Sequence, residues 1–230
     1  MPFGYVEAYK SLRTNLDFMA GSMDVHTLVI TSTVPEESKS NVAVNLAMTM
    51  AESGKKVALI DCDLRKPVLH RYLKAGHNVK GVSNVLSNQC TLDEALQELK
   101  EMNLTFLPAG TPPPNPSEML SQPQMQAMVN TLREKFDVVI FDAPPVSVVT
   151  DAAVIGRYVD GAVFVVRSDY APADAVRGAV KKLQDAGVRV LGSVLTRYDM
   201  KKALKGSSYA YSYAYNYNYA YEKQKADVTE

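Results

Sequence analysis

The stretch HTLVITSTVPEESKSNVAVNLAMTMAESG, residues 26–54, decides the fold class. It opens on an apolar run at 26–32, passes through a polar loop, and continues as a helical pattern over 40–54 that ends at Gly54. An apolar run of this length predicts a buried strand, and the later spacing of apolar residues predicts a helix. The stretch therefore predicts a strand, a loop and a helix in succession, which is the repeating unit of an α/β fold.

The same alternation continues along the chain. Predicted strands lie at 26–32, 55–63, 104–110, 137–145, 161–168 and 188–197. Predicted helices lie at 40–54, 91–100, 122–136 and 172–187, and Thr91 with Glu94 forms a candidate capping box for the second of them. This alternation predicts one α/β domain at about 25–200, with a mostly parallel sheet covered by helices on both faces. A helical arm at 1–24 precedes it, and a tail at 201–230 follows.

Composition excludes several classes of protein. The chain has 230 residues, 25 basic and 25 acidic, so its neutral balance opposes a nucleic-acid partner held by bulk phosphate neutralisation. Two cysteines give no disulfide framework, which favours a reducing cytosol. No apolar run reaches the length of a membrane span, and the N-terminus lacks a signal-peptide pattern. We therefore expect a cytoplasmic protein that reaches a membrane only through a partner.

Acidic side chains stand at the ends of two predicted strands. Asp61 and Asp63 close VALIDCD, and Asp142 closes VVIFD. Ligands of open α/β sheets bind at the carboxyl ends of strands, where such carboxylates can hold a hydrated Mg²⁺. A single aspartate there would be explained more simply as a helix cap or a turn residue. Two such positions favour a metal site.

The loop at 33–40, TVPEESKS, partly matches a phosphate-binding loop. That motif reads G-x-x-x-x-G-K-[ST], in which backbone N–H groups and the lysine bind phosphates. Lys39 and Ser40 match it, but the two glycine positions hold Thr33 and Ser38. Taken alone, the loop is explained as well by ordinary helix capping.

The C-terminal segment 207–222, SSYAYSYAYNYNYAYE, places tyrosines at every second position. They are Tyr209, Tyr211, Tyr213, Tyr215, Tyr217, Tyr219 and Tyr221. The segment lacks the aliphatic residues that would anchor a buried strand, and its composition is typical of disorder. It is either a flexible, aggregation-prone tail or a row of hydroxyls offered to another site.

Taken together, these motifs resemble a known family. VITSTVPEESKSNVAVNLA, VALIDCDLRKP and VVIFDAPPV resemble, in order and spacing, the Walker A, A′ and B motifs of bacterial tyrosine kinases that control capsular and exopolysaccharide synthesis. EAYKSLRTNL, GTPPPNPSEML and the tyrosine cluster extend the resemblance over nearly the whole chain. The Walker motifs are shared with MinD/ParA-like ATPases, which implies a P-loop NTPase fold. The pattern Asp61, Asp63 and Arg65, with the tail, favours the kinase branch.

The resemblance implies a role for each motif residue, with ATP and Mg²⁺ as cofactors. Lys39 would bind the β- and γ-phosphates, Ser40, Asp63 and Asp142 would hold Mg²⁺, and Asp61 would accept the proton of the attacking tyrosine. The nucleotide cradle would comprise Glu36, Glu37, Ser38, Lys39, Ser40 and Asn41. The seven tail tyrosines would accept phosphate in trans, each gaining about −1.5 to −2 charge.

The resemblance also implies partners. Glu7, Lys10 and Arg13 lie on one helix face, where the family uses an E-x-x-R-x-x-R motif for subunit contacts in a ring, although lysine cannot reproduce the fork of an arginine. A transmembrane polysaccharide co-polymerase would recruit and activate the kinase at the inner face of the membrane, and a cognate tyrosine phosphatase would reverse its action. The outcome would be control of polymer length and export.

Besides Lys10, two residues depart from the family pattern. Ser38 replaces the usual glycine before the lysine, which costs about 1 kcal/mol if the position needs a positive φ. Thr196 stands where related ATPases often place an asparagine that reads adenine. Three hypotheses remain: a kinase with weakened ATP binding, an assembly module without catalysis, and a MinD/ParA-like ATPase switch.

Overall fold

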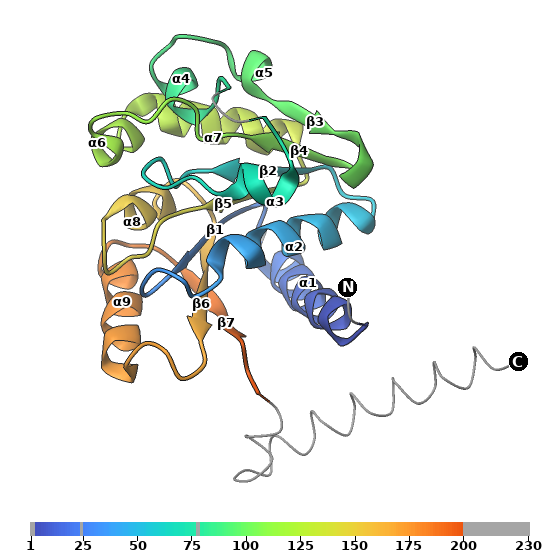
Figure 1. Cartoon of the computed structure of the whole chain (residues 1–230), viewed down its shortest axis with the longest axis vertical. Coiled ribbons are helices and arrows are strands. Elements are labelled where there is room, and N and C mark those ends of the chain that lie inside the picture. Colours follow the sequence, from blue (N-terminus) through green and yellow to red (C-terminus); the bar gives the residue numbers. More distant parts are fainter. Residues whose placement is uncertain (1–2, 24, 77–78, 200–230) are drawn as a thin grey trace, which may run out of the picture.

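The computed structural model describes residues 3–23, 25–76 and 79–199, arranged around a seven-stranded sheet (Figure 1). The strand order is β3-β4-β2-β5-β1-β6-β7, and every pairing is parallel except that of β3 with β4. The strands are β1 Thr27–Ser32, β2 Val57–Asp61, β3 Gln97–Leu99, β4 Leu104–Leu107, β5 Val138–Asp142, β6 Gly161–Arg167 and β7 Val190–Thr196. The predicted α/β fold with a mostly parallel sheet is confirmed.

Helices cover both faces of the sheet (Figure 1). One face carries α1 Phe3–Met23, α2 Lys39–Glu52 and α3 Leu69–Leu73. The other face carries α4 Val82–Leu86, α5 Leu92–Ala95, α6 Pro116–Leu120, α7 Pro123–Lys135, α8 Asp151–Gly156 and α9 Ala173–Asp185. Alternate strand residues point to opposite faces, so Leu28 and Ile30 pack with α2 while Val29 packs in the core on the other face. The central strands are therefore continuous apolar runs because both of their faces are buried.

The prediction of a helix over 91–100 is wrong for most of its length. The Thr91 and Glu94 capping box is present, but the helix ends at Ala95 and Gln97–Leu99 forms β3. A short 3-10 helix, Lys100–Met102, and a left-handed turn at Asn103 bring β3 back along β4. Pairing with β4 satisfies backbone groups that an open sheet edge would leave without partners, and this long-range gain overrides the local helical pattern.

The predicted helical arm is present as α1, and it packs against α2 (Figure 1). Leu16 is buried in the interface, and Arg13 donates a hydrogen bond to the carbonyl oxygen of Thr49 in α2 at 2.8 Å. Glu7 and Lys10 form an ion pair within the arm at 2.7 Å. Their predicted role in subunit contacts stays a prediction.

Two further sequence predictions concern the tyrosine tail and membrane-spanning helices. The seven tyrosines of the tail lie outside the described residues. In the part of the chain that the structure describes, no helix is long and apolar enough to cross a membrane.

Candidate nucleotide and phosphoryl-transfer site

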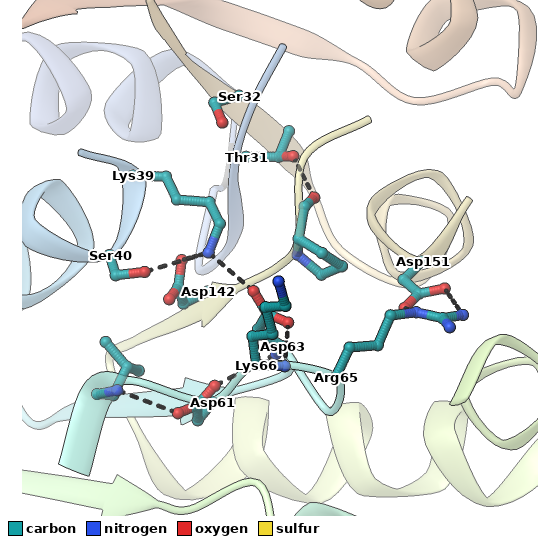
Figure 2. A network of polar contacts seen from close by, with 12 residues as sticks. Thr31, Ser32, Lys39, Ser40, Asp61, Asp63, Arg65, Lys66, Asp142 and Asp151 are labelled. Carbon is teal, nitrogen blue, oxygen red and sulfur yellow. Dashed lines mark hydrogen bonds and ion pairs between the residues drawn. The ribbon is translucent and has the colours of Figure 1, made fainter. Parts of the chain in front are cut away.

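The carboxyl ends of β1, β2 and β5 meet at one edge of the sheet. In the parallel pairing of β2 with β5, Asp61 stands opposite Asp142, and Ile30 of β1 stands opposite Asp142 on its other side. The loop that follows β1 therefore lies beside both carboxylates, and Asp63 follows Asp61 by two residues. The structure thus brings together residues from three separate sequence motifs (Figure 2).

Lys39 lies at the centre of this group (Figure 2). Its Nζ is 3.2 Å from Asp63 Oδ2, 3.4 Å from Asp142 Oδ1 and 3.1 Å from Ser40 Oγ. Burial lowers the pKa of Lys39, but the Asp142 and Asp63 carboxylates raise it by more, so the net pKa lies above its ordinary value. Lys39 is therefore a charged group that holds two carboxylates in place.

Asp61 has a different environment. Its side chain is 1% exposed, its Oδ1 accepts the N–H of Asp63 at 3.2 Å, and its Oδ2 accepts the N–H of Leu69 at 3.2 Å. Burial raises the pKa of Asp61 well above its usual range, and the negative charges of Asp142 and Asp63 raise it further. A carboxylate of this kind accepts a proton more readily than an exposed one.

Asp142 is fully buried, and its Oδ2 has no hydrogen-bond partner among the described residues. Burial raises the pKa of Asp142, and the Lys39 charge and a hydrogen bond from Ser40 reduce this rise without cancelling it. An unpartnered buried carboxylate oxygen next to a hydroxyl and a second carboxylate fits a magnesium ion. No trio of His, Cys, Asp or Glu side chains in the described ranges forms a metal site alone, so a magnesium ion here would need phosphate oxygens and water as further ligands.

The loop before α2 has a backbone conformation that residues other than glycine rarely adopt. Ser38 has φ 72° and Glu36 has φ 66°, both in the left-handed region that favours glycine. The condition attached to the Ser38 substitution, a positive φ, is therefore met. Within the described residues the Ser38 side chain makes no capping hydrogen bond, so the first N–H groups of α2 remain available for an anion.

The Glu37 side chain anchors this loop to the neighbouring strand β6, which the sequence did not indicate. Its side chain is fully buried, with Oε2 accepting the N–H of Val34 at 2.8 Å and Oε1 accepting the N–H of Arg167 at 3.2 Å. The hydroxyl of Thr196 donates to the carbonyl oxygen of Glu37 at 2.9 Å. These bonds fix the strained residues on either side of Glu37, so the loop is ordered by β6 and β7 as well as by its own sequence.

Replacing Glu37 with glutamine is expected to weaken Mg-ATP binding about tenfold, because the amide can accept only one of the two N–H groups and places a donor against the other. Binding of a fluorescent ATP analogue measures the effect, with thermal unfolding as a check on the fold. Glu36→Gln is the matched control, since among the described residues the Glu36 carboxylate accepts a hydrogen bond only from the Tyr170 hydroxyl, at 3.4 Å. Equal affinity in the two variants would contradict the role of Glu37.

Asn41 faces the arm. Its Oδ1 accepts hydrogen bonds from the hydroxyls of Tyr5 and Tyr9, and Asn45 donates to Tyr5 at 3.3 Å. Burial raises the pKa of Tyr9, and its hydrogen bond to Tyr5 adds to the effect. The first turn of α2 is therefore tied to α1, whereas the side chain of Asn41 is engaged away from the carboxylates.

Arg65 lies at the other side of the site (Figure 2). Its Nε donates to Asp151 Oδ2 at 3.0 Å, and one of its terminal nitrogens donates to Ser117 Oγ at 2.9 Å. Asp151 is fully buried at the start of α8. Arg65 thus joins the segment after β2 to α6 and α8. Ser117 lies in the GTPPPNPSEML stretch, but nothing in that stretch or around Asp151 indicated that the two side chains meet Arg65.

Comparison with known proteins identifies the family. Residues 37–171 match the family model described as an AAA domain. Tyrosine-protein kinase YwqD from Bacillus subtilis (strain 168) is 37% identical over 203 residues, which cover 88% of this chain and 84% of the relative. The chain belongs to the bacterial tyrosine-kinase family. The name of this relative, a tyrosine-protein kinase, supports protein-tyrosine kinase activity.

Comparison with solved structures agrees with this assignment. The kinase domain of Escherichia coli tyrosine kinase ETK matches with a TM-score of 0.80 and 34% identity, covering 83% of this chain and 74% of that one. The chimerical protein CapA2B2 matches with a TM-score of 0.80 and 33% identity, covering 86% of each chain. The septum site-determining protein MinD from Pyrococcus horikoshii OT3, complexed with Mg-ADP, shares the P-loop fold at 22% identity and a TM-score of 0.65, covering 75% of this chain and 70% of that one.

In this member of the kinase family, the predicted site residues fall into two groups. The first group lies around the ammonium of Lys39 and comprises Lys39, Ser40, Asp61, Asp63 and Asp142 (Figure 2). Glu36, Glu37 and Ser38 form the loop beside them, with the Glu37 carboxylate turned inward. Their individual roles stay predictions.

Proposed function

We propose that this chain is an ATP- and Mg²⁺-dependent protein-tyrosine kinase that phosphorylates the tyrosines at 209–221 of a second copy of itself. The observation that carries the proposal is the contact of Lys39 with Ser40, Asp63 and Asp142 at the start of α2, with Asp61 beside them. A cation, a hydroxyl, two carboxylates and a buried base are the groups that phosphoryl transfer needs. The row of tyrosines supplies an acceptor that an ATPase switch does not require.

Each group would have a separate task. Ser40, Asp63 and Asp142 would hold Mg²⁺, which would neutralise charge on the phosphates. Lys39 would exchange its carboxylate partners for phosphate oxygens, helped by the loop N–H groups. Asp61 would take the proton of the tyrosine hydroxyl, for which its raised pKa suits it. Positioning and charge neutralisation would supply most of the acceleration, because phosphoryl transfer needs little covalent help from the protein.

The wider role follows from the relatives. We infer that the cytoplasmic end of a transmembrane polysaccharide co-polymerase recruits this kinase to the inner face of the membrane. The chimerical protein CapA2B2, which by its description joins parts of different proteins, supports a separate adaptor. Copies would assemble into a ring through α1, a tyrosine phosphatase would reset the tail, and the cycle would control capsular or exopolysaccharide length and export.

Two alternatives are favoured by single observations. The positive φ of Ser38 favours an assembly module that has lost catalysis, since a serine there is strained and its Cβ crowds the phosphates. The fold shared with MinD favours an ATPase switch that hydrolyses ATP without phosphorylating protein.

Mass spectrometry of the purified chain after incubation with Mg-ATP tests the proposal, with and without an adaptor peptide. We expect phosphate on tyrosines between residues 209 and 221. Samples with ADP in place of ATP are the control. ATP hydrolysis with an unmodified tail would favour the ATPase switch, and neither reaction would favour the assembly module.

Replacing Ser38 with glycine measures how far that residue limits the enzyme. Glycine adopts φ 72° without the strain of about 1 kcal/mol that a serine carries, and it removes a Cβ beside the phosphates. We expect Mg-ATP to bind about five- to tenfold more tightly, as measured with a fluorescent ATP analogue, and the tail to be modified faster. Unchanged affinity would show that the serine is accommodated without cost.

A further inference from the structure

The sheet ends in two edge strands that differ in character (Figure 1). β3 spans only Gln97–Leu99 and carries an exposed carboxylate, Glu98, at its centre. β7 spans Val190–Thr196 and contains neither a charged residue nor a proline. Edge strands of soluble proteins are usually kept from further pairing by shortness, charge or proline. β7 has none of these protections, so it remains able to pair with another strand.

The outer edge of β7 offers backbone hydrogen-bonding groups. Among the described strands β7 pairs only with β6, and the register shift in that pairing lies near the start of β7. The N–H of Ser168 donates to the carbonyl oxygen of Thr196 at 3.0 Å, so the backbone groups of Thr196 point toward β6. Because this direction alternates along a strand, the N–H and C=O groups of Ser193 and Leu195 point away from β6. The later part of β7 is therefore a regular edge with donors and acceptors directed outward.

The side chains of β7 leave apolar surface uncovered beside this edge. Leu195 is 51% exposed, and Ser193 is exposed as well. Val194 between them packs against the core on the α2 face, so Ser193 and Leu195 lie on the opposite face, with α9. A strand laid along β7 would place its own side chains next to these two residues. An aromatic ring opposite Leu195 would bury the exposed part of that side chain.

The segment that follows β7 in the sequence has the pattern of such a strand. Residues 207–222 alternate tyrosine with alanine, serine and asparagine, and no proline or charged residue occurs before Glu222. Tyrosine is favoured in strands, and alternation with a period of two places all the rings on one face. The segment lacks the aliphatic residues that would bury it in a core, but a strand at the edge of a sheet can leave one face to solvent.

The length of the connection favours pairing within one copy of the chain. Residues 197–206 separate the end of β7 from the start of 207–222, and Gly206 is the last of them. Neighbouring strands lie only about 4.8 Å apart, so this connection allows the chain to reverse and run back along β7. A segment joined through so short a connection meets the edge at an effective concentration on the order of millimolar. A second copy in dilute solution competes poorly with it.

We propose that residues 207–222 dock on the outer edge of β7 in the same copy, as an antiparallel strand with the tyrosine rings on the face of Leu195. In this arrangement each tyrosine opposite Ser193 or Leu195 exchanges backbone hydrogen bonds with it. β7 has seven residues, so only part of the segment pairs at one time. Registers that differ by two residues keep the rings on the same face. The docking needs no catalysis, so it stands or falls separately from the kinase function.

Phosphate on the tail would release this strand, a consequence that rests on the proposed function. Each phosphate adds about −1.5 to −2 charge, and tyrosines two residues apart on one strand face are about 6.8 Å apart. Neighbouring phosphates would therefore repel one another, and a charged group would be poorly placed over the apolar side chain of Leu195. The docked strand is thus the unmodified form of the tail, and modification frees the edge of β7.

Amide hydrogen exchange of the full chain, resolved by NMR without nucleotide, tests the docking. The N–H of Leu195 should exchange slowly in the parent, although it points away from β6. Ser193→Pro removes a neighbouring outward donor, which an edge strand tolerates, and Ser193→Thr, which keeps the donor, is its matched control. In a second variant all seven tyrosines between 209 and 221 are replaced by proline, which removes the donors of the docked strand. Thermal unfolding checks that β7 still folds.

We expect the N–H of Leu195 to exchange at least about fivefold faster in Ser193→Pro and in the proline tail than in the parent and in Ser193→Thr. Equal exchange in the parent and the proline tail would overturn the proposal. If both are fast, the edge is uncovered, and if both are slow, it has another occupant. Protection that disappears on dilution would assign the edge to the tail of a second copy, which also overturns docking within one copy.

A chain ligated to a synthetic tail with phosphate on all seven tyrosines tests the release without using the kinase. The N–H of Leu195 should then exchange as fast as in the proline tail. Exchange as slow as in the parent would overturn the release but not the docking. Incubation of the parent with Mg-ATP keeps the two proposals distinguishable. A tail that docks but is never modified would contradict the kinase alone, and a tail that is modified but never docks would contradict this inference alone.

Discussion

Replacing Lys39 with methionine is expected to reduce phosphate transfer to the tail at least about a hundredfold. Lys39 is the cation that the structure places between Asp63 and Asp142 at the start of α2. Methionine has a similar length but no charge. It can therefore neither bind phosphate oxygens nor offset the repulsion between the two carboxylates. Mg-ATP binding should weaken in parallel.

The measurement combines phosphotyrosine mass spectrometry of the tail with binding of a fluorescent ATP analogue. Lys182→Met, an exposed change on α9, is the control for loss of a positive charge. The Lys39 variant should also unfold more easily at pH 8 than at pH 5, because removing the cation raises the pKa of the buried Asp142 further and makes its ionised form more costly. Transfer within about twofold of the parent would show that Lys39 does not act on the phosphates.

Replacing Asp142 with asparagine is expected to stabilise the nucleotide-free protein near pH 8 and to abolish transfer. Burial raises the pKa of Asp142, so its ionised form is costly at pH 8, by about 1.4 kcal/mol for each pKa unit of the rise. The atom at the Oδ2 position has no partner among the described residues, and it stays polar in both the aspartate and the asparagine. Asparagine removes the charge and keeps an oxygen for Ser40 and Lys39. Each kcal/mol corresponds to a rise of roughly 2–4 °C in the unfolding midpoint of a chain of this size.

The stability gained by the Asp142→Asn change should increase with pH. Burial raises the pKa of Asp142 in the folded protein, so between the unfolded value of about 4 and the folded value the native state binds more protons. The stability of the parent therefore falls as pH rises through that window. The neutral asparagine removes this fall, and the gain should be largest near pH 8 and vanish toward pH 4.

Thermal unfolding in a chelator, without nucleotide, measures the gain across pH 5 to 8. Asp185→Asn on α9 is the control, since its side chain is exposed and its effect should stay within about 0.5 kcal/mol. Added Mg-ATP should stabilise the parent more than the Asp142 variant, because ligand binding to the native state raises the midpoint. A lower midpoint for the asparagine variant at pH 8 would mean that the pair with Lys39 outweighs the burial of the carboxylate.

Much of the fold was predictable because its signals are local. The buried strands at 26–32 and 137–145 are continuous apolar runs, and Gly54, with φ 89°, closes α2 as its position indicates. The segment at 97–99 was not predictable in this way. Its sequence continues a capped helix, yet it forms β3 because only in the folded sheet is the edge of β4 open to pairing.

Some residues of the site were also predictable from local sequence, and others were not. Lys39, Ser40 and the aspartates were identified from motif spacing, which reflects their positions at strand ends. Glu37 was predicted as part of the nucleotide cradle, but nothing in the sequence indicated that its carboxylate accepts the N–H of Arg167, which lies 130 residues away in the chain. Arg13 lies on the predicted helical face but bonds to Thr49 of α2. Such partners depend on how elements pack, which periodicity does not encode.

By itself, the sequence determined which chemical groups stand at the ends of its strands and that the strands alternate with helices. Hydrophobic periodicity and motif spacing are properties of short segments, so they can be recognised without knowledge of the fold. Only the tertiary structure decided that Asp61 and Asp142 face each other across β2 and β5 and that Arg65, after β2, meets the buried Asp151 of α8. Strand order and helix packing bring these groups together, because burial of both sheet faces is satisfied only by the whole chain at once.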